Sequence, residues 1–123
     1  MPHAWAETGI EGDLHALIDD YYYAIGENRM NQALNLYHKD SPETRKATQA
    51  LLFGRSSYLQ RTRTLKFDLV HSSGKHRLAR VAHRHLRIVG VKFMESFTTA
   101  EYEFRQQGDE WKIWSSKEQR VRR

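Results

Sequence analysis

The sequence lacks cysteine, and this absence excludes disulfide frameworks, thiolate metal sites and cysteine nucleophiles. It also lacks any apolar run near the roughly 20 residues of a membrane-spanning helix, and its opening segment lacks the charged and apolar blocks of a signal peptide. No internal repeat, low-complexity segment or linker divides the chain. We therefore expect a cytoplasmic protein without membrane contact, folded as one domain over residues 1–123 with an ordered core at about residues 10–119.

The chain does contain enough apolar material for a folded core. Hydrophobic residues make up 39% and aromatic residues 11% of its 123 positions, which excludes a disordered protein. A chain of this length buries roughly two-thirds of its unfolded surface without metal or disulfide crosslinks. The composition thus indicates an ordinary globular domain and names no activity.

Charge is distributed unevenly along the sequence. Residues 1–60 hold five basic and eight acidic side chains, a net charge of −3, whereas residues 61–123 hold fifteen basic and seven acidic ones, a net charge of +8. A basic half is typical of proteins that bind phosphates. An acidic helical layer packed on a basic sheet would give the same distribution, and we favour that interpretation while keeping an anionic partner as the alternative.

The first helix is predicted over residues 14–25, where apolar side chains recur at the spacing of one helix face. A capping box of Thr8 with Glu11, or Asp13 as a rival cap, marks its start. Gly26 ends it, because glycine favours the end of a helix over its interior.

Two further helices are predicted before the first strand. A short one starts at Asn28 and includes Tyr37 on its apolar face. The next begins at Ser41-Pro42-Glu43, where serine caps the free amides, proline pre-sets the first turn and glutamate favours the positive end of the helix dipole. This third helix is expected to run to Tyr58, with Gly54 interrupting it.

After residue 62 the pattern changes to that of strands. Leu65, Phe67 and Leu69 alternate with polar residues and are expected to share one face. Short connections at the predicted turns favour antiparallel pairing, because parallel crossovers need a dozen or more residues. The other alternating segments are residues 100–104 and 111–114, and the turns are residues 72–75 and 107–109.

Residues 77–89 fit two interpretations. As a helix, the segment would carry a continuous stripe of arginines opposite an apolar face, typical of a surface for nucleic acid or an acidic membrane. As a strand, it would place Arg80 and Arg84 on one face and Val81, His83, His85 and Arg87 on the other. We favour the strand, because strands are predicted on both sides and the segment has no convincing helix cap.

Two stretches resemble the nuclear transport factor 2-like superfamily, also called SnoaL-like or cystatin-like. Residues 19–42, DDYYYAIGENRMNQALNLYHKDSP, are similar to its first two helices, and residues 102–113, with Trp111-Lys112-Ile113 opening a strand, look like its last hairpin. The resemblance implies an α+β fold in which three N-terminal helices pack on a strongly curved four-stranded antiparallel sheet. It also implies a pocket between helices and sheet and a homodimer through the outer sheet face.

The resemblance implies less about chemistry. Tyr21 loosely matches the tyrosine that donates to the oxyanion in ketosteroid isomerase, a member of the superfamily. The general-base aspartate of that enzyme has no counterpart, because Ser41-Pro42-Glu43-Thr44 starts a helix where the hairpin carrying the base would lie. Without that carboxylate a proton-abstraction mechanism loses its base.

His83 and His85 are the candidate catalytic residues beside Tyr21. Two residues apart on a strand, they would point to the same face and could exchange protons. A metal site would need a third ligand, such as Glu101 or His71, and we assign no metal. The sequence contains no phosphate-binding glycine loop, nucleophile elbow or HExxH motif, so no cofactor is implied.

The primary hypothesis is a domain that binds a small ligand in a pocket between helices and sheet. One alternative is a non-enzymatic interaction domain that binds nucleic acid or an acidic protein through Arg80 and Arg84. Another is an isomerase-, dehydratase- or cyclase-like enzyme that uses Tyr21 with His83 or His85. Trp114 would need a cover on the outer face of its strand, which favours the homodimer. The residues expected to line the pocket are Tyr21, Phe67, Val81, His83, Tyr102 and Trp111.

Overall fold

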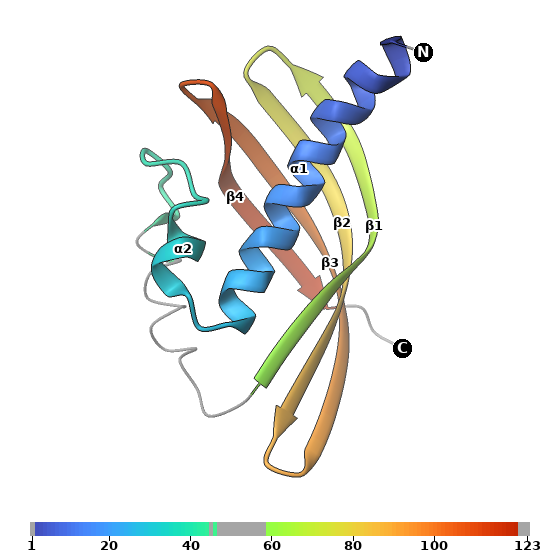
Figure 1. Ribbon diagram of the computed structural model, residues 1–123, viewed down its shortest axis with the longest axis vertical. Coiled ribbons are helices and arrows are strands. Elements are labelled where there is room, and N and C mark those ends of the chain that lie inside the picture. The colour runs from blue at the N-terminus through green and yellow to red at the C-terminus, as the bar shows by residue number, and fades with distance from the viewer. Residues whose placement is uncertain (1, 45, 47–58, 121–123) are drawn as a thin grey trace.

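The computed structural model describes residues 2–44, 46 and 59–120. A long helix crosses the concave side of a strongly bent four-stranded sheet (Figure 1). Each strand pairs antiparallel with the next one along the chain, which gives the sheet order β1-β2-β3-β4. The elements are α1 (Pro2–Gly26), α2 (Met30–Leu34), β1 (Leu59–Ser73), β2 (His76–Val89), β3 (Lys92–Gln107) and β4 (Glu110–Arg120).

Helix α1 begins earlier than the capping signals predicted. It starts at Pro2, so Thr8, Glu11 and Asp13 all lie inside the helix, and both proposed N-caps are wrong. Proline suits a first helical position because its fixed φ matches the helix and its missing N–H would have no partner there. None of the described helices has the length and apolar content needed to cross a bilayer.

The predicted end of α1 at Gly26 is confirmed, and packing explains the residue. A Cβ atom at this position would lie 2.7 Å from the backbone oxygen of Gln60, closer than side-chain carbons approach oxygen. Glycine therefore allows the helix end to touch the start of β1. Asn28 then reverses the chain with a φ of +58°, a conformation that asparagine tolerates better than most residues.

The second helix is shorter than predicted, because Tyr37 leaves it to pair with β4. Tyr37 forms a bridge with Ile113, supported by 2.8 Å backbone hydrogen bonds from His38 N to Ile113 O and from Ile113 N to Leu36 O. Ser41 then caps the next turn as predicted, since its Oγ accepts the Glu43 N–H at 3.1 Å. Most of the predicted third helix falls on residues 45 and 47–58, outside the described residues.

The segment 77–89 is a strand, and the helical interpretation is wrong. It lies in β2, whose backbone pairs with β1 on one side and β3 on the other. Burial alternates over most of it as predicted: Val81, His83 and His85 are buried on the concave face, while Arg80 is exposed on the convex face. Arg87, predicted on the face of the histidines, is exposed.

One alternation in β1 was misjudged. The register with β2 shifts between Thr64 and Lys66, so Leu65 is the extra residue of a bulge and its side chain is 51% exposed. Phe67 and Leu69 still pack on the core as predicted. A bulge reverses the alternation of a strand, and residue spacing alone did not reveal it.

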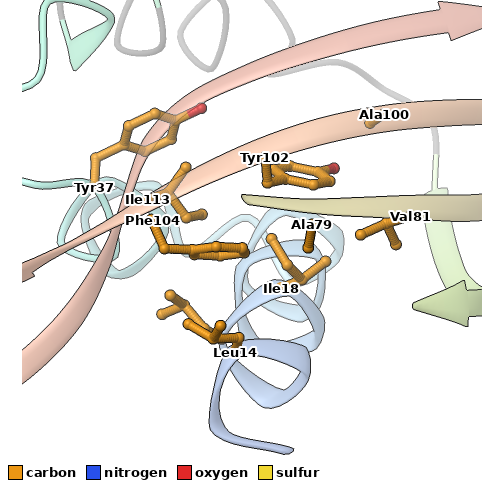
Figure 2. Close-up of a cluster of buried hydrophobic side chains, with 10 residues drawn as sticks. Leu14, Ile18, Tyr37, Ala79, Val81, Ala100, Tyr102, Phe104 and Ile113 are labelled. Atoms are coloured by element: carbon orange, nitrogen blue, oxygen red, sulfur yellow. The ribbon is translucent and has the colours of Figure 1, made fainter. Parts of the chain in front are cut away.

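The core lies between α1 and the concave face of the sheet (Figure 2). Leu14 and Ile18 of α1 meet Phe104 of β3 and Ile113 of β4, all fully buried. Each such side chain contributes about 1.5–3 kcal/mol by leaving water. Trp111, expected to line the pocket, packs against this cluster while remaining partly exposed.

The convex face carries the charges. Glu101 and Glu103 lie there and form ion pairs, Glu101 with Arg80 at 3.3 Å and Glu103 with Arg105 at 2.6 Å. Trp114 is partly covered by its own chain: the Arg105 guanidinium lies 3.8 Å from its ring centroid, and the His38 ring meets it edge-on at 5.2 Å. The need for a partner subunit to cover Trp114 is therefore reduced, and the homodimer stays a prediction.

Candidate functional site

Strand β2 aims two buried histidines at the concave face. His83 is fully buried and His85 nearly so, and their ring centroids lie 5.6 Å apart. Strand periodicity explains the arrangement, because residues two apart point to the same side of a sheet. Two imidazoles in a core need hydrogen-bond partners to offset the loss of water.

His83 finds its partner in a tyrosine chain. Its Nε2 lies 2.8 Å from the Tyr102 hydroxyl, which lies 2.9 Å from the Tyr22 hydroxyl. Tyr22 then donates to Oε2 of Glu118 at 3.4 Å. We name Tyr22, His83, His85, Tyr102 and Glu118 the histidine–tyrosine cluster; α1, β2, β3 and β4 each supply at least one member.

His85 is held by two threonines from the neighbouring strands. Its Nδ1 lies 2.9 Å from the Thr62 hydroxyl of β1, and its Nε2 lies 2.8 Å from the Thr98 hydroxyl of β3. Glu118 approaches the same Nε2 at 4.0 Å. Both ring nitrogens therefore have partners, and the ring orientation is fixed by three strands.

Burial keeps the rings of this cluster uncharged at neutral pH. Burial first, and then the nearby His85 and His15, lower the pKa of His83 to about 4. Burial also lowers the pKa of His85, although the Glu118 carboxylate acts in the opposite direction. The hydroxyl pKa values of Tyr22 and Tyr102 are raised, mainly by burial. The rings act as neutral hydrogen-bonding groups.

The carboxylate gives the tyrosine chain a direction. An ionised Glu118 only accepts, so Tyr22 donates to it, Tyr102 donates to Tyr22, and His83 donates its Nε2–H to Tyr102. In that arrangement Nδ1 of His83 carries the lone pair. This buried atom has no hydrogen-bond partner among the residues that the structure describes.

A cleft of about 510 Å³ opens between α1 and β1 beside the cluster. Tyr22 lines the cleft and belongs to the cluster, and Thr62 lines it while binding His85. The cleft therefore borders the polar network directly. Its lining residues are Asp19, Asp20, Tyr22, Tyr23, Gly26, Glu27, Arg61, Thr62, Arg63 and Thr64.

The structure brings two of the three predicted catalytic residues together. His83 and His85 are neighbours, but Tyr21 packs edge-on against Tyr37 at 5.7 Å and forms no hydrogen bond with either histidine. Tyr22 instead occupies the place predicted for Tyr21. Burial raises the hydroxyl pKa of Tyr21.

The predicted pocket residues share the concave face without lining the cleft. His83 and Tyr102 belong to the histidine–tyrosine cluster, and Val81 lies in the apolar core. Phe67 stacks on His15 at 5.2 Å, and Trp111 lies under the Arg77 guanidinium at 4.8 Å. The cleft uses the α1 and β1 edge instead.

Sequence reasoning missed four residues that complete the site. Tyr22 follows Ile18 by four positions, so the helical stripe contained its signal. Thr62, Thr98 and Glu118 gave none, because each reaches the histidines from another strand, and no single segment encodes how the strands pair.

The suggested third metal ligands point elsewhere. Glu101 lies on the convex face, and His71 is exposed near the end of β1. Within the described part of the chain, no group of three histidine, aspartate or glutamate side chains is arranged to hold a metal ion. Arg80 and Arg84, the candidates for an anionic partner, are each ion-paired, Arg84 with Glu95.

Comparison with known proteins identifies relatives by family and by fold. The family model described as the C-terminal domain of anti-sigma-I factor RsgI9 matches residues 16–123. A search of curated proteins found no match.

Solved structures share the fold of the nuclear transport factor 2-like superfamily, as the sequence resemblance predicted. A proposed dehydratase from Streptomyces avermitilis is 13% identical, with a TM-score of 0.76 over 95% of this chain and 99% of that chain. The β subunit of benzoate 1,2-dioxygenase from Burkholderia mallei is 14% identical, with a TM-score of 0.74 over 85% and 86%. A protein of unknown function from Pseudomonas putida is 16% identical, with a TM-score of 0.71 over 90% and 86%.

Proposed function

The chain belongs to the family of the C-terminal domain of anti-sigma-I factor RsgI9. We propose that this member of the family binds a small molecule in the cleft between α1 and β1. The observation that carries the proposal is the contact between the cleft and the histidine–tyrosine cluster. Tyr22 lines the cleft and hydrogen-bonds to Tyr102 within the cluster. Thr62 lines the cleft and hydrogen-bonds to His85 of the cluster. Clefts of about 300 to 1,000 Å³ hold small organic ligands, and those ligands are oriented by a few fixed polar groups.

The protonation states favour binding over catalysis. A general base works best when its pKa lies near the working pH, and the pKa of His83 is lowered to about 4. Tyr22 and Tyr102 hold their protons tightly, because burial raises their pKa values. Such groups are well suited to recognising a ligand by hydrogen bonds and poorly suited to moving protons at neutral pH, so the enzyme alternative has less support.

The relatives agree with a binding role without requiring it. The matched family is named for the C-terminal domain of an anti-sigma-I factor. The structural relatives include a proposed dehydratase, a dioxygenase subunit and a protein of unknown function, so the fold alone supports no single activity. Binding of nucleic acid has less support, because Arg80 and Arg84 already pair with glutamates.

The proposal is tested by two-dimensional NMR of the chain with a library of small aromatic alcohols, amides and acids. We expect fragments to shift the backbone amides of Tyr22, Thr62 and Thr64 selectively. The Thr62→Val variant should weaken binding by about threefold or more, because it removes the hydroxyl shared by the cleft and His85.

Thr99→Val is the matched control, since Thr99 lies on the convex side of β3. It should leave fragment affinity unchanged. Absence of fragment binding at millimolar concentration, or shifts confined to residues away from the cleft, would contradict the proposal.

A further inference from the structure

The cleft between α1 and β1 is closed at both ends by contacts between the helix and the strand. At one end the Thr64 hydroxyl donates to Asp19 at 2.8 Å. At the other end Arg61 donates to the backbone oxygen of Gly26 at 3.2 Å and to Glu27 at 3.4 Å. Because a helix rises about 1.5 Å per residue, Asp19 and Gly26 lie about 10 Å apart along α1. The cleft is thus a slot of defined length.

These contacts use three of the five charged residues that line the slot. Asp19 bonds Thr64 and also pairs with His15 at 3.4 Å, and Glu27 pairs with Arg61. Asp20 and Arg63 remain, and among the described residues neither has an ion-pair or hydrogen-bond partner. One acidic residue from α1 and one basic residue from β1 therefore line the same slot.

We propose that the slot binds a small zwitterion, such as a free α-amino acid, with its ammonium group toward Asp20 and its carboxylate toward Arg63. This inference rests on the proposed ligand-binding function and names the ligand class. An arginine guanidinium suits a carboxylate because its parallel N–H groups match the two carboxylate oxygens.

The remaining lining residues favour an aromatic or long apolar side chain on the zwitterion. The Tyr22 ring forms one wall beside the cluster, and the exposed Tyr23 ring lines the slot as well. Aromatic rings attract both apolar groups and ammonium groups. A volume of about 510 Å³ leaves room for such a side chain beyond the charged groups.

The experiment compares four probes that share a phenyl ring and differ in charge. L-Phenylalanine carries both charges, phenethylamine only the positive one, 3-phenylpropanoate only the negative one, and 3-phenylpropanol neither. NMR titration of the wild-type chain should show L-phenylalanine binding at least about fivefold more tightly than either singly charged probe, since each exposed ion pair is worth about 1 kcal/mol. The shifted amides should be those of the slot.

Two variants assign the charges. Asp20→Asn should reduce the affinity for L-phenylalanine and phenethylamine while leaving 3-phenylpropanoate unchanged or slightly improved. Arg63→Gln should reduce the affinity for L-phenylalanine and 3-phenylpropanoate while leaving that for phenethylamine unchanged or slightly improved. Asp109→Asn in the β3–β4 turn and Lys117→Gln on the convex face of β4 are the matched charge controls and should change none of the four affinities.

The outcomes separate this inference from the proposed function. If 3-phenylpropanol shifts the slot amides with the same affinity as L-phenylalanine, the slot binds ligands but the zwitterion inference is wrong. If none of the four probes binds while library fragments still shift the slot amides, the inference again fails alone. If neither probes nor fragments shift those amides, both the inference and the proposed function fail.

Discussion

The concave face of the sheet has two regions that the same elements build from opposite chemistry. In one region Ile18 of α1, Val81 of β2 and Phe104 of β3 pack without polar atoms (Figure 2). One step further along α1 and β2, the inward positions become Tyr22 and His83. Helix and strand thus change from apolar to polar within one turn or one alternation.

The difference shows that the apolar region stabilises the fold, whereas the polar region forms the candidate site. The apolar region gains free energy directly by leaving water. The polar region only recovers the cost of burial through its hydrogen bonds, so a set of apolar side chains would stabilise the fold at least as well. A buried polar cluster next to a cleft is therefore best understood as a site, and the two regions should respond differently to substitution and to pH.

The largest expected effect comes from the apolar region. Phe104→Ala removes a fully buried ring and should lower the free energy of unfolding by about 3–5 kcal/mol, because transfer and cavity terms add. Urea denaturation followed by tryptophan fluorescence measures the change. Thr99→Ala on the convex face of the same strand is the control, with an expected change within about 0.5 kcal/mol. A loss below about 1 kcal/mol for Phe104→Ala would place the core elsewhere.

The polar region should instead make stability depend on pH. The folded state holds His83 at a pKa of about 4, below its ordinary value of 6.5, so the unfolded chain binds more protons between these values. Stability contributed by neutral His83 is fully present above pH 6.5 and is lost as the pH falls toward 4. The total loss is on the order of 3 kcal/mol.

Comparing the free energy of unfolding of wild type with that of His83→Gln at each pH isolates the contribution of His83 from those of the other titrating groups. The stability difference between the two proteins should change between pH 6.5 and 4.5 in the direction that penalises wild type at low pH. His71→Gln, at an exposed position of β1, should follow wild type throughout. Parallel pH profiles for wild type and His83→Gln would show that His83 is not held neutral by the fold.

Much of this architecture was predictable, because it depends on local signals. The turns at Gly74 and Gly108 were predicted from sequence, and both glycines adopt positive φ values that other residues avoid. Alternation in residues 77–89 correctly assigned His83 and Arg80 to opposite faces. The Ser41 cap was also correct, because a cap needs only residues next to it.

The errors share a dependence on distant contacts. The helical stripe contains both Tyr21 and Tyr22, and only the rotation of α1 on the sheet decides which of them reaches Tyr102. The bulge at Leu65 depends on pairing with β2, and Glu118 reaches the cluster from the last strand. The cleft depends on how α1 meets β1, which no single segment encodes.

The smallest expected effect tests whether the polar region is one connected network. Tyr102→Phe keeps the ring and removes the hydroxyl that joins His83 to Tyr22, and burial leaves the His83 nitrogen without a replacement partner. The free energy of unfolding should fall by about 1–2 kcal/mol, the cost of an unsatisfied buried group. Tyr23→Phe, which removes a hydroxyl from a ring that is 59% exposed, should cost within about 0.5 kcal/mol. Tyr102→Phe should also perturb the imidazole ¹⁵N shifts of His83, whereas Tyr23→Phe should leave them unchanged. Equal stability losses in the two variants, with unchanged His83 shifts in both, would mean that the hydroxyl chain contributes nothing and that the polar region is a set of independent side chains.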